Sequence, residues 1–195
     1  MTAHQLQQSL FSEGAGSQEP DVTYVSEFVK NQEHWFEKLR SNLDWNNQYQ
    51  SRKYHSFGVR YNSQSGENHV GVLPKFLTPV CDRIEQVFGY YPNNCLANYY
   101  PDGDHYISFH SDQDMDMTEH SGVTIVSLGA VRNMVLRRID SHQSRFYYPL
   151  EPGSAFYMRD RIQKDWQHGV LKQAGAGPRI SLSFRRLQVP ESGQS

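Results

Sequence analysis

The sequence predicts a mainly β fold with flanking helices, built around a double-stranded β-helix (jelly-roll) core. Apolar residues recur at helical spacing in two early segments only. From Asn94 onward the pattern alternates with a period of two, in short runs that proline and glycine separate. Two helices followed by seven or eight short strands favour a jelly roll with the helices packed outside. A length of 195 residues suits one domain with its own core.

The two helices precede the strands. The first is expected over about 27–43, where Ser26 offers an N-cap and apolar residues recur at near-helical spacing. The second begins at Thr78, which resembles an N-cap followed by proline in the first turn, and ends at Gly89. Its expected apolar stripe consists of Val80, Ile84 and Val87.

The strands are recognised by alternation between two faces. We expect them at 94–100, 106–112, 122–129, 132–139, 145–149, 154–158 and 179–187. The two faces of the first strand carry Leu96, Asn98 and Tyr100 on one side and Cys95, Ala97 and Tyr99 on the other. In the second strand, Ser108, His110 and Asp112 share a face with Tyr106, opposite Ile107 and Phe109.

Domain organisation follows from composition. Residues 1–20 are polar and are expected to form a mobile N-terminal segment. A single domain is expected over 21–190, with short strands and loops at about 45–72 and the jelly-roll core at about 94–187. The net charge of −2 does not indicate a nucleic-acid binder, although basic residues cluster at 52–60, 132–145 and 159–164.

The absence of a membrane-length apolar run and of a secretory signal predicts an intracellular protein, cytoplasmic or nuclear, with no membrane association. Cys81 and Cys95 form no disulfide framework, and we favour two free thiols. We expect a monomer.

His110, Asp112 and His168 form the strongest candidate site. Residues i and i+2 of a strand point the same way, so His110 and Asp112 can reach one ion, while His168 must come from a distant strand. Two histidines and one carboxylate suit ferrous iron with open positions, whereas structural zinc would want a fourth ligand. A calcium loop is excluded, because its sixth and twelfth positions are Met117 and Val123 rather than Gly and Glu.

Arg179 and Arg185 lie on a segment with one wholly polar and one wholly apolar face. A surface strand would show the same alternation. Arginine also suits a carboxylate, because its planar fork donates two parallel hydrogen bonds. Six residues span about 20 Å, so only long side chains leaning inward would hold one small diacid between them.

Three stretches together resemble the AlkB-like family of Fe(II)- and 2-oxoglutarate-dependent dioxygenases: CLANYYPDGDHYISFHSDQD, VTIVSLGAVRNMVLRR and DWQHGVLKQAGAGPRISLSFRRL. They lie between Asn94 and Leu187, about half the chain, and RKYHSFGVRY at 52–61 resembles the family's substrate-side segment more weakly. The resemblance implies Fe(II), 2-oxoglutarate as cosubstrate and O2. It also implies oxidative demethylation of alkylated nucleobases such as 1-methyladenine and 3-methylcytosine in DNA or RNA, releasing formaldehyde, succinate and CO2.

The resemblance further implies roles for single residues. The metal ligands, on which catalysis depends, would be His110, Asp112 and His168. The cosubstrate would be held by Asn98, Tyr100, Ser181, Arg179 and Arg185. Within that set, Arg179 would pair with the distal carboxylate and Arg185 would steady Asp112, while Ser181 departs from the family's common Asn.

The substrate base is expected to contact residues near the pocket rim. Asp114 matches a family acid that approaches the base. Tyr54, Phe57 and Tyr61, set near Arg52, suit a base held between aromatic faces. An ordinary amphipathic hairpin with these aromatic residues in its core explains the segment equally well.

Two other functions stay open. An oxygenase acting on a protein, a lipid or a small molecule would suit the net charge of −2 and the acidic stretch 102–119. A non-catalytic jelly-roll module would use the same ligands, since metal-binding residues predict binding rather than turnover.

Overall fold

Two antiparallel sheets face each other in the computed structural model, which describes residues 19–59, 71–112, 117–119 and 121–189. The six-stranded sheet has the order β1 (Val22–Val25), β8 (Ala155–Arg159), β5 (Gly122–Gly129), β10 (Arg179–Arg185), β3 (Asn94–Tyr100), β2 (Lys53–Gly58). The four-stranded sheet has the order β4 (Ile107–His110), β9 (Trp166–Val170), β6 (Arg132–Arg138), β7 (Arg145–Leu150). The mainly β jelly-roll prediction is confirmed.

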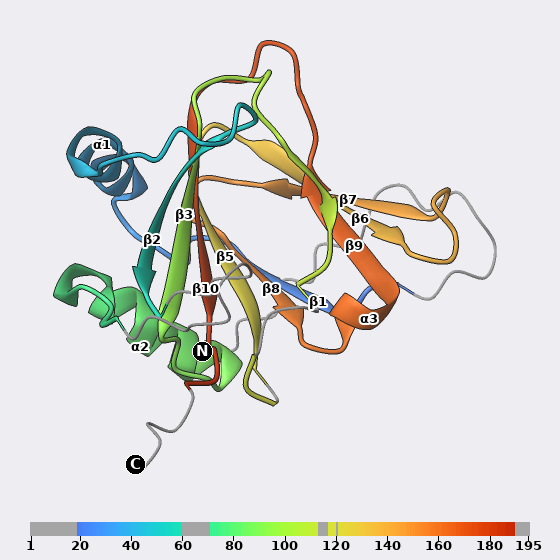
Figure 1. Ribbon diagram of the computed structural model, residues 1–195, viewed down its shortest axis with the longest axis horizontal. Helices are drawn as coiled ribbons and strands as arrows, with labels where there is room; N and C mark the ends of the chain where they lie inside the picture. Colours follow the sequence, from blue (N-terminus) through green and yellow to red (C-terminus); the bar gives the residue numbers. More distant parts are fainter. Residues whose placement is uncertain (1–18, 60–70, 113–116, 120, 190–195) are drawn as a thin grey trace.

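The helices pack on the outside of the six-stranded sheet. Figure 1 shows α1 (Gln32–Asn42) and α2 (Thr78–Phe88) on one side of this sheet and the four-stranded sheet on the other. The turn η1 (Lys75–Leu77) leads into α2, and α3 (Ile162–Asp165) leads into β9. The helix-side core joins both long helices to the outer sheet face, and a second core fills the space between the sheets. The inner face of each central strand points between the sheets, where part of the space is core and part is an interior pocket.

Helix α2 begins and ends close to the predicted positions, although its N-cap is Leu77 and Thr78, predicted as the N-cap, is the first helical residue. It covers Thr78–Phe88, and Gly89 closes it in the left-handed region with φ of 80°. The predicted stripe is right for Val80 and Ile84, which are buried, but wrong for Val87, whose side chain is 45% exposed. Cys81 is buried instead, because it lies on the face of the helix that packs into the helix-side core.

A pair of truncations on α2 tests this packing. Ile84→Ala should lower the free energy of unfolding by about 2–5 kcal/mol, because Ile84 is fully buried and its removal leaves a cavity. Val87→Ala, which removes a similar apolar side chain from the exposed face, should change it by about 0.5 kcal/mol or less. Urea unfolding of the two variants measures both values. Equal losses would contradict the described orientation of α2.

Helix α1 begins later than the sequence suggests. The expected helix over 27–43 starts at Gln32, and its N-cap is Asn31 rather than Ser26. Glu27 and Asn31 have φ values of 51° and 53°, so the chain turns before the helix begins. Phe28 is nonetheless buried in the helix-side core, and it belongs to that turn rather than to the helical stripe.

Besides the turn η1, two elements were not in the prediction. β1 pairs with β8 at one edge of the large sheet, and the four-residue helix α3 precedes β9. For β9, the prediction was only that His168 lies on a distant strand, with no bounds for that strand. The predicted strand 106–112 is shorter, since β4 ends at His110, and a register shift after Ile107 brings that side chain to the pocket, contrary to the predicted face.

The predicted N-terminal segment 1–20 lies almost wholly outside the described residues. Neither cysteine forms a disulfide in the described part of the chain, as expected. None of the helices described has the length and apolar character that crossing a bilayer demands.

Candidate metal centre and its pocket

A cavity of about 290 Å³ lies between the two sheets. Its floor includes alternate residues of β10, which share one face of the strand: Arg179, Ser181, Ser183 and Arg185. All four side chains are buried. The polar face of this strand therefore points into the protein, and the alternative of a surface strand does not apply.

The register of the neighbouring strands adds further polar groups to the floor. Ser181 lies opposite Asn98 of β3 on one side and opposite Ser127 of β5 on the other. Arg179 lies opposite Tyr100 in the same way. All five predicted cosubstrate residues thus line one cavity: Asn98, Tyr100, Arg179, Ser181 and Arg185.

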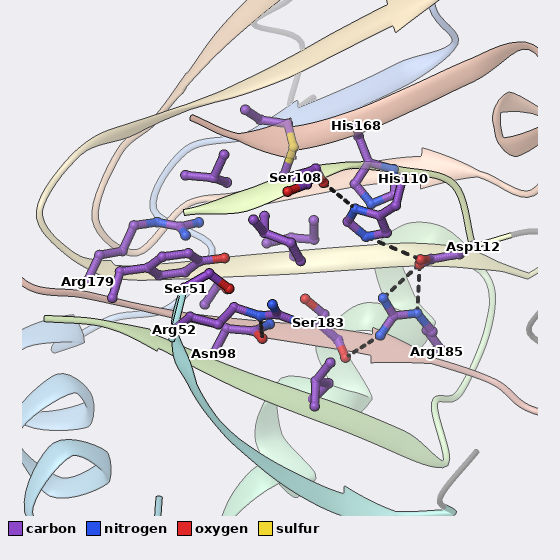
Figure 2. A pocket seen from close by; sticks show the side chains of 17 residues that line it. Ser51, Arg52, Asn98, Ser108, His110, Asp112, His168, Arg179, Ser183 and Arg185 are labelled. Carbon is purple, nitrogen blue, oxygen red and sulfur yellow. Dashed lines mark hydrogen bonds and ion pairs between the residues drawn. The ribbon is translucent and has the colours of Figure 1, made fainter. Parts of the chain in front are cut away.

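The three predicted metal ligands come together at one end of this cavity. β4 and β9 pair so that His110 lies opposite His168, and their rings are 4.3 Å apart between centroids. Asp112 follows two residues after the end of β4. One potential ligand atom from each of the three residues lies within 4.8 Å of the other two. Figure 2 shows the three side chains converging.

Hydrogen bonds orient both ends of this cluster. His110 Nδ1 lies 2.8 Å from the backbone carbonyl of Ser108, which can only accept, so Nδ1 carries the proton. Nε2 is then free to bind a metal and lies 3.6 Å from Asp112 Oδ1. Arg185 donates from Nε and Nη2 to Asp112 Oδ2 at 2.9 and 2.7 Å, which leaves Oδ1 available.

The electrostatic environment sets the protonation states that a metal requires. Burial raises the pKa of the Asp112 carboxyl, but the positive charge of Arg185 and the two histidines outweigh burial and lower the pKa to about 2. Burial lowers the pKa of His168 to about 3, against the attraction of Asp112. An ionised carboxylate and a neutral imidazole are therefore present at neutral pH, and this donor set fits ferrous iron.

Arg179 marks the opposite end of the cavity, as Figure 2 shows. Its side chain is fully buried, and Nη2 donates to Ser127 Oγ at 3.0 Å. Nε and Nη1 have no hydrogen-bond partner among the described residues. Burial lowers the pKa of Arg179, while the neighbouring Tyr100 acts in the opposite direction. A buried guanidinium with free donors fits the distal carboxylate of a dicarboxylic acid.

Of the predicted substrate residues, Arg52 lines this cavity, and Tyr54 lies beside a lining residue without lining the cavity itself. Arg52 lines it and donates from Nε to Asn98 Oδ1 at 2.8 Å, and its guanidinium lies 5.1 Å from the Tyr49 ring centroid. Tyr54 lies opposite Asn98 in the β2–β3 pairing and contacts the Tyr49 ring at 5.3 Å.

The structure does not bring Phe57 to the cavity. Phe57 lies opposite Cys95, on the other face of β2, and its ring packs 5.8 Å from that of Phe76 in the helix-side core. Its place in the predicted substrate set is therefore not supported, because the odd positions of β2 face the helices. Tyr61 and Asp114 lie outside the described residues.

Three functional side chains escaped the sequence analysis. Ser127 contacts Arg179, and its position as a polar residue in the predicted strand 122–129 was an available signal. Gln163 contacts Asp112 from α3, with no signal in the sequence. Arg132, assigned to a basic cluster, is fully buried and donates to the carbonyls of Asp102, His105 and Leu171. It ties together the chain connections at the Arg179 end of the cavity.

Fold and site together define a jelly-roll protein built to hold a metal beside a small dicarboxylic acid. The sequence profile of the 2OG-Fe(II) oxygenase superfamily matches residues 2–185. The chain belongs to this superfamily, and its resemblance to AlkB-like proteins is confirmed by the relatives it matches.

Two curated relatives and one solved structure illustrate the similarity. The DNA oxidative demethylase ALKBH2 of Bos taurus is 33% identical over 119 residues, which cover 57% of this chain and 43% of the relative. The alpha-ketoglutarate-dependent dioxygenase alkB homolog 3 of Mus musculus is 30% identical over 120 residues, covering 57% and 42%. The structure of OsALKBH1 superposes with a TM-score of 0.67 at 16% identity, covering 88% of this chain and all of that one. The chain spans about half the length of the curated relatives it matches.

Proposed function

We propose that this protein is an Fe(II)- and 2-oxoglutarate-dependent dioxygenase that oxidatively demethylates alkylated nucleobases in DNA or RNA. The observation that carries the proposal is the pairing, in one cavity, of the His110, Asp112 and His168 cluster with the partly unpaired guanidinium of Arg179. A keto diacid suits both: its keto acid end can bind a metal held by the cluster, and its distal carboxylate can pair with Arg179. When bound, iron together with 2-oxoglutarate and O2 supplies the oxidising chemistry.

The side chains of this protein bind and orient. Arg179 anchors the distal carboxylate of the cosubstrate. Asn98 and Ser181, on the cavity floor, orient the carbon chain of the cosubstrate. Arg185 keeps Asp112 ionised and turned toward the histidines. The cavity walls also include apolar side chains that exclude water from the reacting centre: Leu96, Ile107, Ile125, Met134 and Val170.

A nucleobase is the substrate class that the relatives favour, since the matching relative from Bos taurus is named a DNA oxidative demethylase. Arg52 and the neighbouring rings of Tyr49 and Tyr54 support this choice, because a base taken out of its stack is held by aromatic faces and cationic side chains. Arg159 and Arg161 are already paired with Asp21 and give no added support.

A product assay tests the proposal. Oligonucleotides carrying 1-methyladenine or 3-methylcytosine, single- or double-stranded, DNA or RNA, are incubated with the protein, Fe(II), 2-oxoglutarate and O2. We expect equal amounts of formaldehyde and unmethylated base from at least one member of the panel, and no product from the His110→Ala variant. Succinate formed without any demethylated base would overturn the nucleobase assignment and favour a protein, lipid or small-molecule substrate.

We further propose an intracellular monomer, cytoplasmic or nuclear. Cys81 and Cys95 are free and buried, and burial raises the pKa of both thiols. Free thiols suit a reducing compartment. Sedimentation of the purified protein tests the monomer.

A further inference from the structure

The backbone of Asp112 is held by a side chain from another element. Asp112 lies beyond the end of β4, where the pairing with β9 has stopped. Its N–H donates to Gln163 Oε1 at 3.0 Å. Asp112 is 3% exposed and Gln163 is 2% exposed, so water cannot substitute for this bond without opening the site. Gln163 therefore determines where the main chain of this metal ligand lies.

Gln163 is itself firmly placed. It belongs to α3, and its N–H donates to the carbonyl of Asp160 at 3.2 Å. Its neighbours Ile162 and Trp166 are both buried in the core between the sheets. β9 begins at Trp166 and carries His168. The segment 162–168 thus provides one metal ligand directly and the backbone anchor of a second.

We propose that Gln163 is a positioning residue of the metal centre, which sets the place of Asp112 relative to His168. Arg185 holds Asp112 through Oδ2 and Gln163 holds it through the main chain, so the residue is fixed at both ends and presents Oδ1 to the metal. Neither contact alone would define the position of Oδ1. The inference rests on the proposed function only in requiring that a metal bind at this cluster. Groups that orient metal ligands typically affect metal affinity by about 10–100-fold.

The test measures metal binding rather than turnover. Gln163→Leu removes the acceptor and keeps a similar volume. Mn(II) alone is titrated into wild type and variant, and the free ion is quantified by electron paramagnetic resonance. We expect the Kd for Mn(II) to rise about tenfold or more in the variant. In the metal-free protein, hydrogen exchange at the Asp112 amide should become faster, because the N–H loses its acceptor.

Gln167→Leu is the matched control. Gln167 also lies on this segment, and its Oε1 accepts two hydrogen bonds from Arg137 at 3.0 and 2.8 Å. Its loss removes comparable hydrogen bonding without releasing Asp112, so Mn(II) affinity should stay at the wild-type value. If Gln163→Leu does not fold, Gln163→Asn serves in its place. Its side chain is one methylene shorter, so the acceptor lies farther from the Asp112 N–H, and the Kd for Mn(II) should again rise.

The outcomes separate this inference from the proposed function. Wild-type protein that binds no Mn(II) would overturn both. Tight Mn(II) binding by wild type and by Gln163→Leu alike, with an unchanged Asp112 amide, would overturn the positioning role and leave the enzyme proposal standing. Equal weakening by Gln167→Leu would also overturn it, since the effect would then belong to the whole segment.

Discussion

Arg179→Met should abolish useful binding of 2-oxoglutarate while leaving the protein without ligand at least as stable as wild type. Removing one partner of a buried, hydrogen-bonded charge pair weakens binding by about 2–5 kcal/mol, or about 30-fold to several thousand-fold in Kd. Without ligand, however, the buried guanidinium has unpaired donors, and an apolar side chain of similar length is tolerated as well or better. Calorimetric titration in the presence of Mn(II) measures the affinity, and urea unfolding measures the stability.

Arg186→Met is the control for this result. Arg186 follows the same strand but is exposed, so its replacement should leave both quantities unchanged. Retention of 2-oxoglutarate affinity within about tenfold of wild type by Arg179→Met would contradict the assignment of Arg179 as the anchor. A large loss of stability in the same variant would show instead that the guanidinium is a structural requirement.

Asp112→Ala and His110→Ala should abolish turnover alike but differ sharply in stability. Each removes a proposed metal ligand. Activity should therefore fall by more than the factor of about 10–100 that is typical when a group orienting a ligand is lost. Asp112→Ala also leaves Arg185, which is 4% exposed, without its partner, and the free energy of unfolding should fall by about 3–5 kcal/mol. The His110 side chain is 35% exposed, and its truncation should lower stability by about 1 kcal/mol or less.

Urea unfolding of the two metal-free variants distinguishes these cases, with Mn(II) binding as a check that both lose the metal. Equal losses of stability would mean that the pair of Asp112 and Arg185 does not support the fold. Residual metal binding by either variant at the wild-type Kd would contradict its assignment as a ligand.

The strands with clear alternation were predictable from sequence. β5 was predicted to the residue, because glycines lie at both ends of a run rich in β-branched residues. The polar face of β10 was visible as well, but whether it faced solvent or a cavity depended on its two partner strands. Alternation indicates that two faces differ and does not indicate which one is inside.

Other features depend on tertiary contacts that leave no local trace. α3 is too short to show a helical period, and the side chain of Gln163 resembles any surface glutamine in the sequence. Arg132 was assigned to a solvated cluster by its charge, yet it is buried and donates from Nη1 and Nη2 to three backbone carbonyls of two distant connections. Tyr54 and Phe57 are both aromatic residues of β2, and they differ in the face of the strand that carries them: Tyr54 lies on the cavity side and Phe57 on the helix side.

The hydrogen bond from Arg52 to Asn98 joins the two halves of the site. Asn98 lines the proposed cosubstrate site and Arg52 lies on the segment proposed to meet the base, so this hydrogen bond connects the two proposed ligand sites. Two linked ligands obey a thermodynamic cycle. If the dicarboxylate raises the affinity for the base by some factor, the base must raise the affinity for the dicarboxylate by the same factor. Coupling between the proposed substrate and 2-oxoglutarate through this bond would therefore appear equally in the affinity for either ligand.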